Sequence, residues 1–145
     1  MGGGFGGDEE KQGMILVDTS VWIDFFKGVG SEYQQRLHDL IAEGRDICLA
    51  DVILTEILQG IKRDKEFEDV RSYLLEFRCY SGRGVDTFVK ASQIYRACSK
   101  KGRTVRKTID CIIASIAIEN DLEIFHNDMD FDLISEWTDL RILKL

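Results

Sequence analysis

Residues 14–28 read MILVDTSVWIDFFKG, and this stretch indicates the fold class of the chain. Four apolar residues run straight into Asp18, and a Thr-Ser pair then separates this carboxylate from a second apolar-rich segment. The pattern is typical of a buried strand followed by a short helix. A carboxylate directly after a buried strand is an unusual place for a charge, so the question is what Asp18 faces.

Short apolar runs and helical patterns alternate along the rest of the chain. We expect strands over residues 15–17, 46–49, 78–80, 122–125 and 140–143. We expect helices over residues 21–26, 31–42, 52–62, 65–77, 86–100 and 108–120, and a helical turn over residues 131–135. Ser31 and Thr108 are the predicted N-caps of two of these helices. Strands that alternate with helices predict an α/β sandwich with a parallel sheet.

The length of 145 residues is enough for one domain with a core and too short for two. Residues 1–13 are glycine-rich and aperiodic, so we expect a flexible leader, either native or added in cloning, before a single domain at 14–145. The longest apolar run, at residues 111–118, is far too short to span a bilayer, and no signal-peptide pattern precedes the fold. The expected location is the cytosol.

The cysteine and histidine residues argue against two kinds of chemistry. The four cysteines form no Cys-x-x-Cys pair, and the two histidines have no ligand spacing to them, which argues against a zinc site. Neither histidine lies near a candidate Ser or Cys motif, which argues against a catalytic triad.

The charge balance is acidic overall but has one basic segment. The net charge of −7 argues against a polyanionic partner. Residues 94–107, however, hold six basic residues and no acidic one. These are Arg96, Lys100, Lys101, Arg103, Arg106 and Lys107. A solvated helix end also explains such a run.

Four carboxylates stand at positions that could form a site, although each also has a structural explanation. Asp18 and Asp128 follow predicted strands, at the sheet edge where parallel α/β folds bind ligands. Asp18 could instead cap the next helix, and Asp128 could belong to an Asn-Asp turn. Glu56, in the apolar helix VILTEILQG, needs a partner or an exposed face. Asp110 lies in a first helical turn, where the helix dipole favours an anion.

The order and spacing of these acids resemble a known family. The segments ILVDTSVWIDFF, LTEILQG, TIDCIIASIA and IFHNDMDF are similar to the four acidic motifs of PIN domains, most closely to those of VapC toxins of toxin–antitoxin pairs. The resemblance covers residues 14–145 and implies a PIN-like α/β/α sandwich with a mostly parallel central sheet of about five short strands. It also implies that Asp18, Glu56, Asp110 and Asp128 gather around a divalent metal. Asp130 matches an accessory acid, and the Thr-Ser pair after Asp18 supports the site.

The chemistry of such a cluster agrees with this resemblance. Converging carboxylates repel one another unless a cation holds them, and hard oxygen ligands select Mg²⁺ or Mn²⁺. A metal of this kind activates water and stabilises charge on a phosphate. We therefore predict a metal-dependent endoribonuclease with catalytic Asp18, Glu56, Asp110 and Asp128. Arg103, Arg106 and Lys107 are predicted to bind RNA phosphate.

The resemblance further implies partners, and other functions stay open. The implied partners are a tRNA or ribosomal RNA substrate, a VapB-like antitoxin and a second copy of the chain. Trp22, Phe25 and Phe26 would either contact the antitoxin or pack in the core. The alternatives are an inactive PIN-like binding module and, less well supported, a metal-dependent phosphatase, which would need an acid where Ser20 stands. A receiver domain would need an adjacent acidic pair near Asp18, and none is present.

Overall fold

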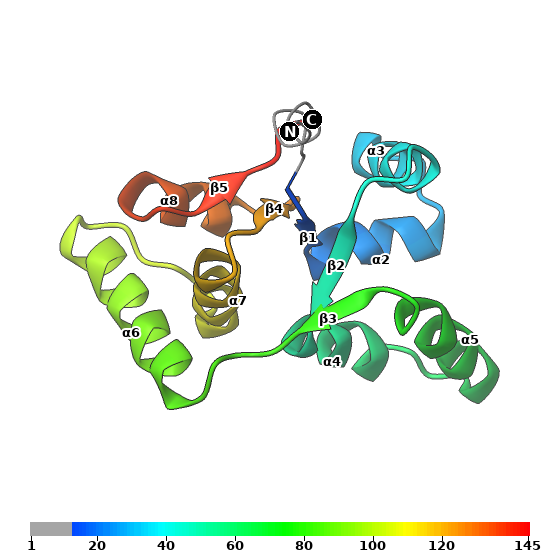
Figure 1. Ribbon diagram of the computed structural model, residues 1–145, viewed down its shortest axis with the longest axis horizontal. Coiled ribbons are helices and arrows are strands. Elements are labelled where there is room, and N and C mark those ends of the chain that lie inside the picture. The colour runs from blue at the N-terminus through cyan, green and yellow to red at the C-terminus, as the bar shows by residue number, and fades with distance from the viewer. Residues whose placement is uncertain (1–12) are drawn as a thin grey trace, which may run out of the picture.

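The computed structural model describes residues 13–145, so the predicted leader lies, except for Gly13, outside the described residues. The strands are β1 (Ile15–Val17), β2 (Ile47–Ala50), β3 (Arg78–Tyr80), β4 (Glu123–Phe125) and β5 (Arg141–Ile142). The helices are α2 (Thr19–Lys27), α3 (Glu32–Ala42), α4 (Asp51–Gln59), α5 (Asp64–Leu74), α6 (Val85–Lys100), α7 (Thr108–Glu119) and α8 (Met129–Trp137). Figure 1 shows their arrangement. No helix among these is long and apolar enough to cross a membrane.

The five strands form one sheet in the order β3-β2-β1-β4-β5. Every pairing is parallel, which confirms the predicted fold class and extends "mostly parallel" to the whole sheet. β1 is central, and its three residues are fully buried. A central parallel strand is covered on both faces, which explains why its sequence is a continuous apolar run and not an alternating one.

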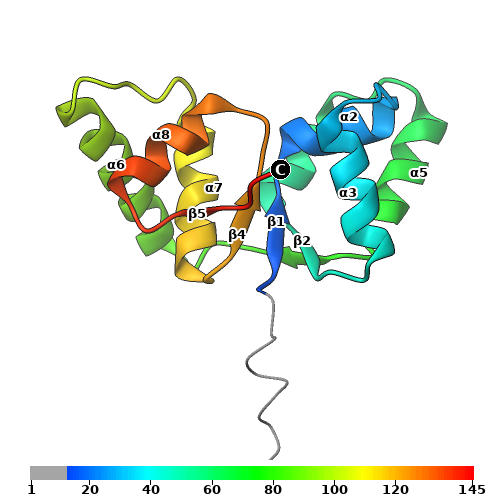
Figure 2. The same ribbon diagram turned by 90° about the horizontal axis from the view of Figure 1, so that it is seen from above.

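Helices cover the two sides of the sheet (Figure 2). α6, α7 and α8 pack together on one side, while α2, α3 and α5 lie on the other. α4 contacts α2, α5 and α7. On the second side Trp22 is fully buried, within an aromatic cluster that includes Phe25, Phe26, Tyr73 and Phe77. Of the two expected roles, antitoxin contact or core packing, Trp22 therefore has the second. Phe25 and Phe26 are only partly buried.

Two local predictions at the C-terminal half were wrong. Thr108 is not an N-cap: it is the first residue of α7, the cap position is Lys107, and no side chain caps this helix. The turn predicted at residues 131–135 is a helix of nine residues. α8 begins earlier because the Asp128 side chain accepts the backbone N–H of Asp130 and caps the helix.

The connections bring the acids to one edge of the sheet. Val17 and Phe125 are register partners, so the residues that follow β1 and β4 emerge side by side. The backbone N–H of Asp18 donates to the carbonyl of Phe125 at 2.9 Å, which ties the two chain segments together. The N-terminus of α7 reaches this same edge (Figure 2).

Candidate metal centre

Three carboxylates converge where α7 and α8 begin. One oxygen from each of Asp110, Asp128 and Asp130 lies within 4.8 Å of the other two. Asp110 comes from the first turn of α7, Asp128 caps α8, and Asp130 lies in the first turn of α8. Asp110 and Asp130 are buried, and Asp128 is half-buried. Such a group of oxygen ligands is the donor set that Mg²⁺ or Mn²⁺ prefers.

Asp110 is the member that most needs a cation. Its side chain is almost completely buried, and its Oδ2 has no hydrogen-bond partner among the described residues. The pKa of Asp110 is raised to about 8: burial is the largest cause, Lys107 opposes it, and the charges of Asp18, Asp128 and Asp130 add to it. A buried carboxylate oxygen without a donor is costly. The residues present therefore fit a bound divalent metal.

Asp128 and Asp130 are held by basic residues that precede α7. Lys107 Nζ lies 3.0 Å from Asp128, and the Arg106 guanidinium contacts Asp128 at 3.2 Å and Asp130 at 3.4 Å. The backbone N–H of Arg106 also donates to Asp130. Burial alone would raise the pKa of Asp128, but the Asp130 N–H and Lys107 hold it below its ordinary value. Two of the three predicted RNA-binding residues thus pair with the acidic cluster.

Asp18 both caps α2 and faces the cluster. Its carboxylate accepts the backbone N–H of Ser20 at 3.0 Å and the Ser20 hydroxyl at 2.7 Å. Burial raises the pKa of Asp18 against these hydrogen bonds. Asp18 is not within the group of three, but its charge acts on Asp110 and on Lys107. The structure thus shows the capping role of Asp18, and its role in a metal site stays a prediction.

Glu56 lies beside the cluster without joining it. The Thr19 hydroxyl donates to Glu56 Oε1 at 2.7 Å, so the half-buried Glu56 is linked to the residue that follows Asp18. The Thr-Ser pair thus contacts two predicted acids, Ser20 holding Asp18 and Thr19 holding Glu56. Of the four predicted acids, the structure brings Asp110 and Asp128 into the group of three and leaves Asp18 and Glu56 outside it.

His126 was missed by the sequence reasoning. It is buried, its Nδ1 accepts the backbone N–H of Asp128 at 2.9 Å, and its Nε2 lies 3.2 Å from Asp132. Nδ1 accepts here, so the ring proton is on Nε2, where it donates to Asp132. The segment IFHND contained the signal: a histidine two residues before a candidate ligand. This spacing fits neither a zinc site nor a catalytic triad, the two roles for which the histidines were weighed.

Comparison with known proteins identifies relatives along almost the whole chain. The PIN domain family matches residues 15–136. The VapC ribonuclease Mb1587 of Mycobacterium bovis is 34% identical over 129 residues, which are 88% of this chain and 96% of that protein. Ribonuclease VapC1 of Methanocaldococcus jannaschii is 30% identical over 130 residues, 89% of this chain and 87% of that protein.

Solved structures show the same fold. VapBC2 from Rickettsia felis, bound to a DNA fragment from its promoter, superposes with a TM-score of 0.70 at 16% identity. The match covers 90% of this chain and 97% of that one. VapC20 of Mycobacterium tuberculosis, described as a sarcin-ricin loop cleaving toxin, superposes with a TM-score of 0.62 at 16% identity, over 88% and 98% of the two chains.

Proposed function

The chain belongs to the PIN domain family, and from this premise we propose that it is a VapC-type endoribonuclease toxin that depends on Mg²⁺ or Mn²⁺. The observation that carries the proposal is the buried Asp110 carboxylate, which lies where Asp128 and Asp130 converge. Its Oδ2 accepts no hydrogen bond within residues 13–145 and has Lys107 Nζ, at 3.9 Å, as its ion-pair partner there. These three carboxylates would hold the metal, and Asp18 would complete the set. A divalent metal bound there supplies a Lewis acid that activates water for attack on an RNA phosphodiester.

The chain's own residues have separate tasks in this proposal. Ser20 holds the Asp18 carboxylate by two hydrogen bonds, and Thr19 orients Glu56 beside it. His126 fixes the backbone at Asp128, which positions that carboxylate against Asp110. Arg106 and Lys107 reach the cluster from its solvent side, because half or more of each side chain is exposed. Cations in that position face an approaching phosphate.

Cleavage of a single-stranded RNA with added Mn²⁺ tests the activity. We expect cleavage by the parent protein, its loss in EDTA, and its collapse in Asp18→Asn and Asp110→Asn, since each change removes a ligand charge and keeps the side-chain size. Asp69→Asn is the matched control, because Asp69 is an exposed partner of Lys65 on α5. RNA cleavage by Asp110→Asn at the parent rate contradicts the metal site. Binding of RNA without any cleavage by the parent favours the inactive binding module.

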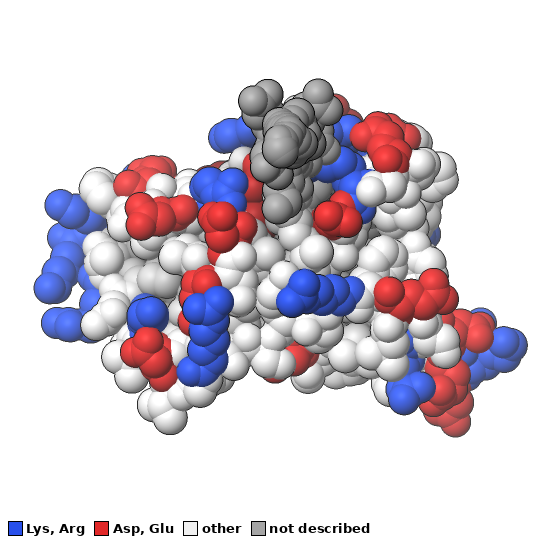
Figure 3. All heavy atoms as spheres, in the orientation of Figure 1, with Lys and Arg blue, Asp and Glu red and all other residues white. Residues whose placement is uncertain are grey.

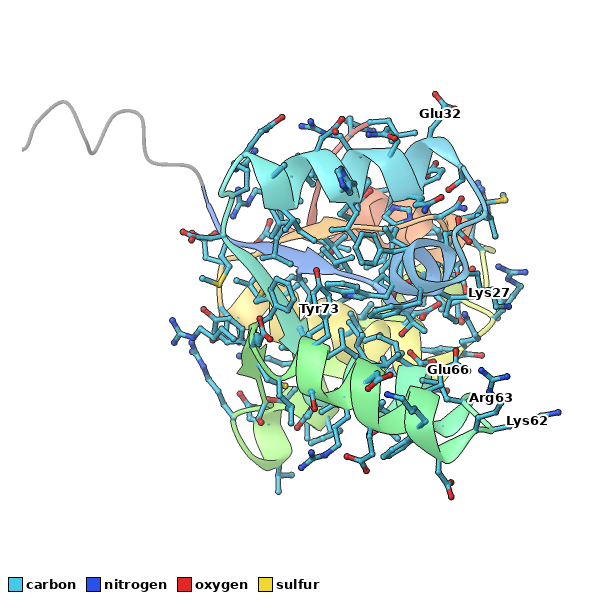
Figure 4. The ribbon with its side chains drawn as sticks, turned by 90° about the vertical axis from the view of Figure 1, so that its right-hand side faces the viewer. Lys27, Glu32, Lys62, Arg63, Glu66 and Tyr73 are labelled. Carbon is cyan, nitrogen blue, oxygen red and sulfur yellow. The ribbon has the colours of Figure 1, made fainter. Side chains whose placement is uncertain are left out.

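The same proposal includes an antitoxin partner. Five apolar and five charged residues, with Gly60, line a hollow of about 470 Å³ between α2, α4 and α5, and Glu56 belongs to its wall. The apolar part consists of Ile23, Phe26, Ile57, Ile61 and Val70. Figure 4 shows Lys27, Lys62, Arg63 and Glu66 on this side of the molecule. Several of the similar solved structures are VapBC complexes. We therefore assign the hollow to an apolar segment of a VapB-like antitoxin.

Ile61→Glu tests this assignment because it places a charge in the apolar part of the hollow. We expect the variant to lose binding of a VapB-like antitoxin and to keep RNA cleavage. Lys65→Gln, an exposed change on α5, should bind as the parent does. Unchanged binding by Ile61→Glu contradicts the assignment. The leader at residues 1–13, the single domain at 14–145 and homodimerisation stay predictions.

A further inference from the structure

Trp137 is a partly exposed aromatic residue at the end of α8. It is 40% exposed, whereas the only other tryptophan, Trp22, is completely buried. Lys101 Nζ lies 5.1 Å from the centre of the Trp137 ring, a cation–π distance. An exposed tryptophan that is covered on one side by a lysine has the two elements that single-stranded nucleic acid sites combine, a stacking surface and a cation.

A basic hollow of about 430 Å³ lies against this ring. Its lining residues come from the C-terminal part of α6 and from Trp137: Gln93, Arg96, Ala97, Lys100, Lys101 and Trp137. The lining contains three cations and no acid, and within residues 13–145 none of the three forms an ion pair. Figure 3 shows Lys and Arg side chains gathered at the edge of the molecule beside α6. A polyanion complements such a surface.

The basic hollow adjoins a second hollow, which a nucleobase could enter. Trp137 takes part in the wall of a second hollow, of about 470 Å³, which includes the apolar side chains of Ile94, Ala97 and Ile118. The ring therefore belongs to the walls of both hollows, and the acids Glu119 and Asp139 line only the second one. A nucleobase is planar and largely apolar on its faces, so it suits the ring, while its phosphates suit the basic side.

α8 connects this surface to the candidate metal centre. Asp128 caps the helix and Trp137 is its last residue. Nine residues at 1.5 Å each separate the two Cα positions by about 13 Å, or about four stacked nucleotides at 3.4 Å each. One short RNA strand can therefore reach both places.

We propose that Trp137, with Lys101, Lys100 and Arg96, forms a subsite for single-stranded RNA at a distance from the metal centre. One base stacks on the Trp137 ring, and the three cations contact the phosphates beside it. The proposal rests on the proposed function for its substrate class, but it concerns binding and needs no cleavage. Its consequence is a preference for substrates that are unpaired several nucleotides from the cut.

Tryptophan fluorescence tests the subsite directly, because the buried Trp22 supplies a constant background. The probe is a single-stranded RNA of about ten nucleotides, added to the full chain at low salt in EDTA so that no cleavage occurs. We expect saturable quenching. In Trp137→Leu the quenching should disappear, and the affinity for a labelled RNA of the same sequence should fall about tenfold. Lys101→Gln should lower the slope of log K against log salt by about 0.7, whereas Lys65→Gln should leave it unchanged.

The outcomes separate this inference from the proposed function. Quenching by single-stranded but not by fully paired RNA supports the subsite, even if the parent protein cleaves no RNA. The inference is overturned if RNA binds without quenching, if RNA does not bind, or if Trp137→Leu binds as the parent does. Quenching only by an added protein partner also overturns it. None of these results would contradict the proposal that the parent protein cleaves RNA when a divalent metal is present.

Discussion

At the scale of single residues, Asp110 has two compatible explanations. Its carboxylate lies in the first turn of α7, where the helix dipole favours an anion. The dipole does not account for an Oδ2 that accepts no hydrogen bond within residues 13–145, or for the raised pKa, which follows from burial and from neighbouring negative charges. The folded protein without metal therefore holds a proton that the unfolded chain has released at neutral pH.

This pKa predicts how the stability of the metal-free protein depends on pH. The pKa of Asp110 is about 8 in the folded chain and 3.8 as a free group, so between these values the folded state binds more protons than the unfolded state. The free energy of unfolding should therefore fall as pH rises from about 4 to about 8, by at most about 1.4 kcal/mol per pH unit from this group, and level off above. Denaturant unfolding in EDTA at a series of pH values measures this.

Asp110→Asn isolates the contribution of this one carboxyl group. Because Asn does not titrate, the variant should lose that part of the pH dependence and be more stable than the parent at about pH 8. Asp69→Asn, at an exposed position, should follow the parent curve. Parallel curves for the parent and Asp110→Asn would show that the carboxyl group titrates normally.

A second residue-scale prediction concerns metal binding by Asp18. Asn caps a helix as well as Asp does, so Asp18→Asn should keep α2 and the fold. The variant should bind Mn²⁺ more weakly, and added Mn²⁺ should raise its melting temperature less than that of the parent. Calorimetric titration with Mn²⁺ and thermal melts with and without Mn²⁺ provide both readouts. Equal Mn²⁺ affinity in both proteins would show that Asp18 caps α2 and does not bind the metal.

At the scale of the elements, α8 depends on the residue that also faces the metal. Asp128 Oδ1 accepts the Asp130 N–H at the start of the helix and also contacts Arg106, while Lys107 contacts Oδ2. One side chain thus starts the helix and contributes to the acidic cluster. The helix then carries Trp137 at its far end, so its position sets the spacing between the two proposed sites.

Two substitutions at Asp128 should separate these tasks. Asp128→Asn keeps the capping acceptor, whereas Asp128→Ala removes it and should lower the free energy of unfolding by about a further 1 kcal/mol. Both variants lose the charge, so both should bind Mn²⁺ more weakly than the parent. Denaturant unfolding in EDTA and Mn²⁺ titration measure the two effects. Equal unfolding free energies for Asn and Ala would contradict the capping role.

At the scale of the whole molecule, the acidic total conceals a divided charge distribution. The net charge is −7, yet the basic residues from Arg96 to Lys107 run from the end of α6 to the start of α7. Arg106 and Lys107 are engaged by the acidic cluster, whereas Arg103 forms no ion pair within residues 13–145. Arg103 is therefore the predicted RNA contact whose charge is free to act on a phosphate.

The salt dependence of RNA binding should reveal this difference. Arg103→Gln should weaken the binding of single-stranded RNAs of any sequence and lower the slope of log K against log salt by about 0.7. Lys65→Gln removes an equally exposed charge from α5 and should leave the slope unchanged. Binding measured in EDTA from low to moderate salt tests the prediction. An unchanged slope for Arg103→Gln would show that Arg103 is a solvated residue without a phosphate contact.

The local pattern of the chain predicted the five strands and six of the seven helices within residues 13–145, and α8 was the exception. The apolar run before Asp18 predicted β1 at residues 15–17, and the weak run at residues 78–80 predicted β3, both confirmed. Such predictions succeed because a strand's burial and a helix's periodicity are recorded in consecutive residues. The rule that parallel strands end at one edge then placed Asp18 and Asp128 together.

The composition of the cluster depended on packing between distant segments. Asp130 joins Asp110 because α8 packs against α7 and its cap turns the first helical turn toward the acids. Glu56 is held aside by Thr19, and Lys107 lies against Asp128 across 21 positions of sequence. The local repeat of apolar residues in the sequence does not tell which residues of distant segments will touch. They follow from how α4, α7 and α8 are placed by the core, where small displacements decide which side chains touch.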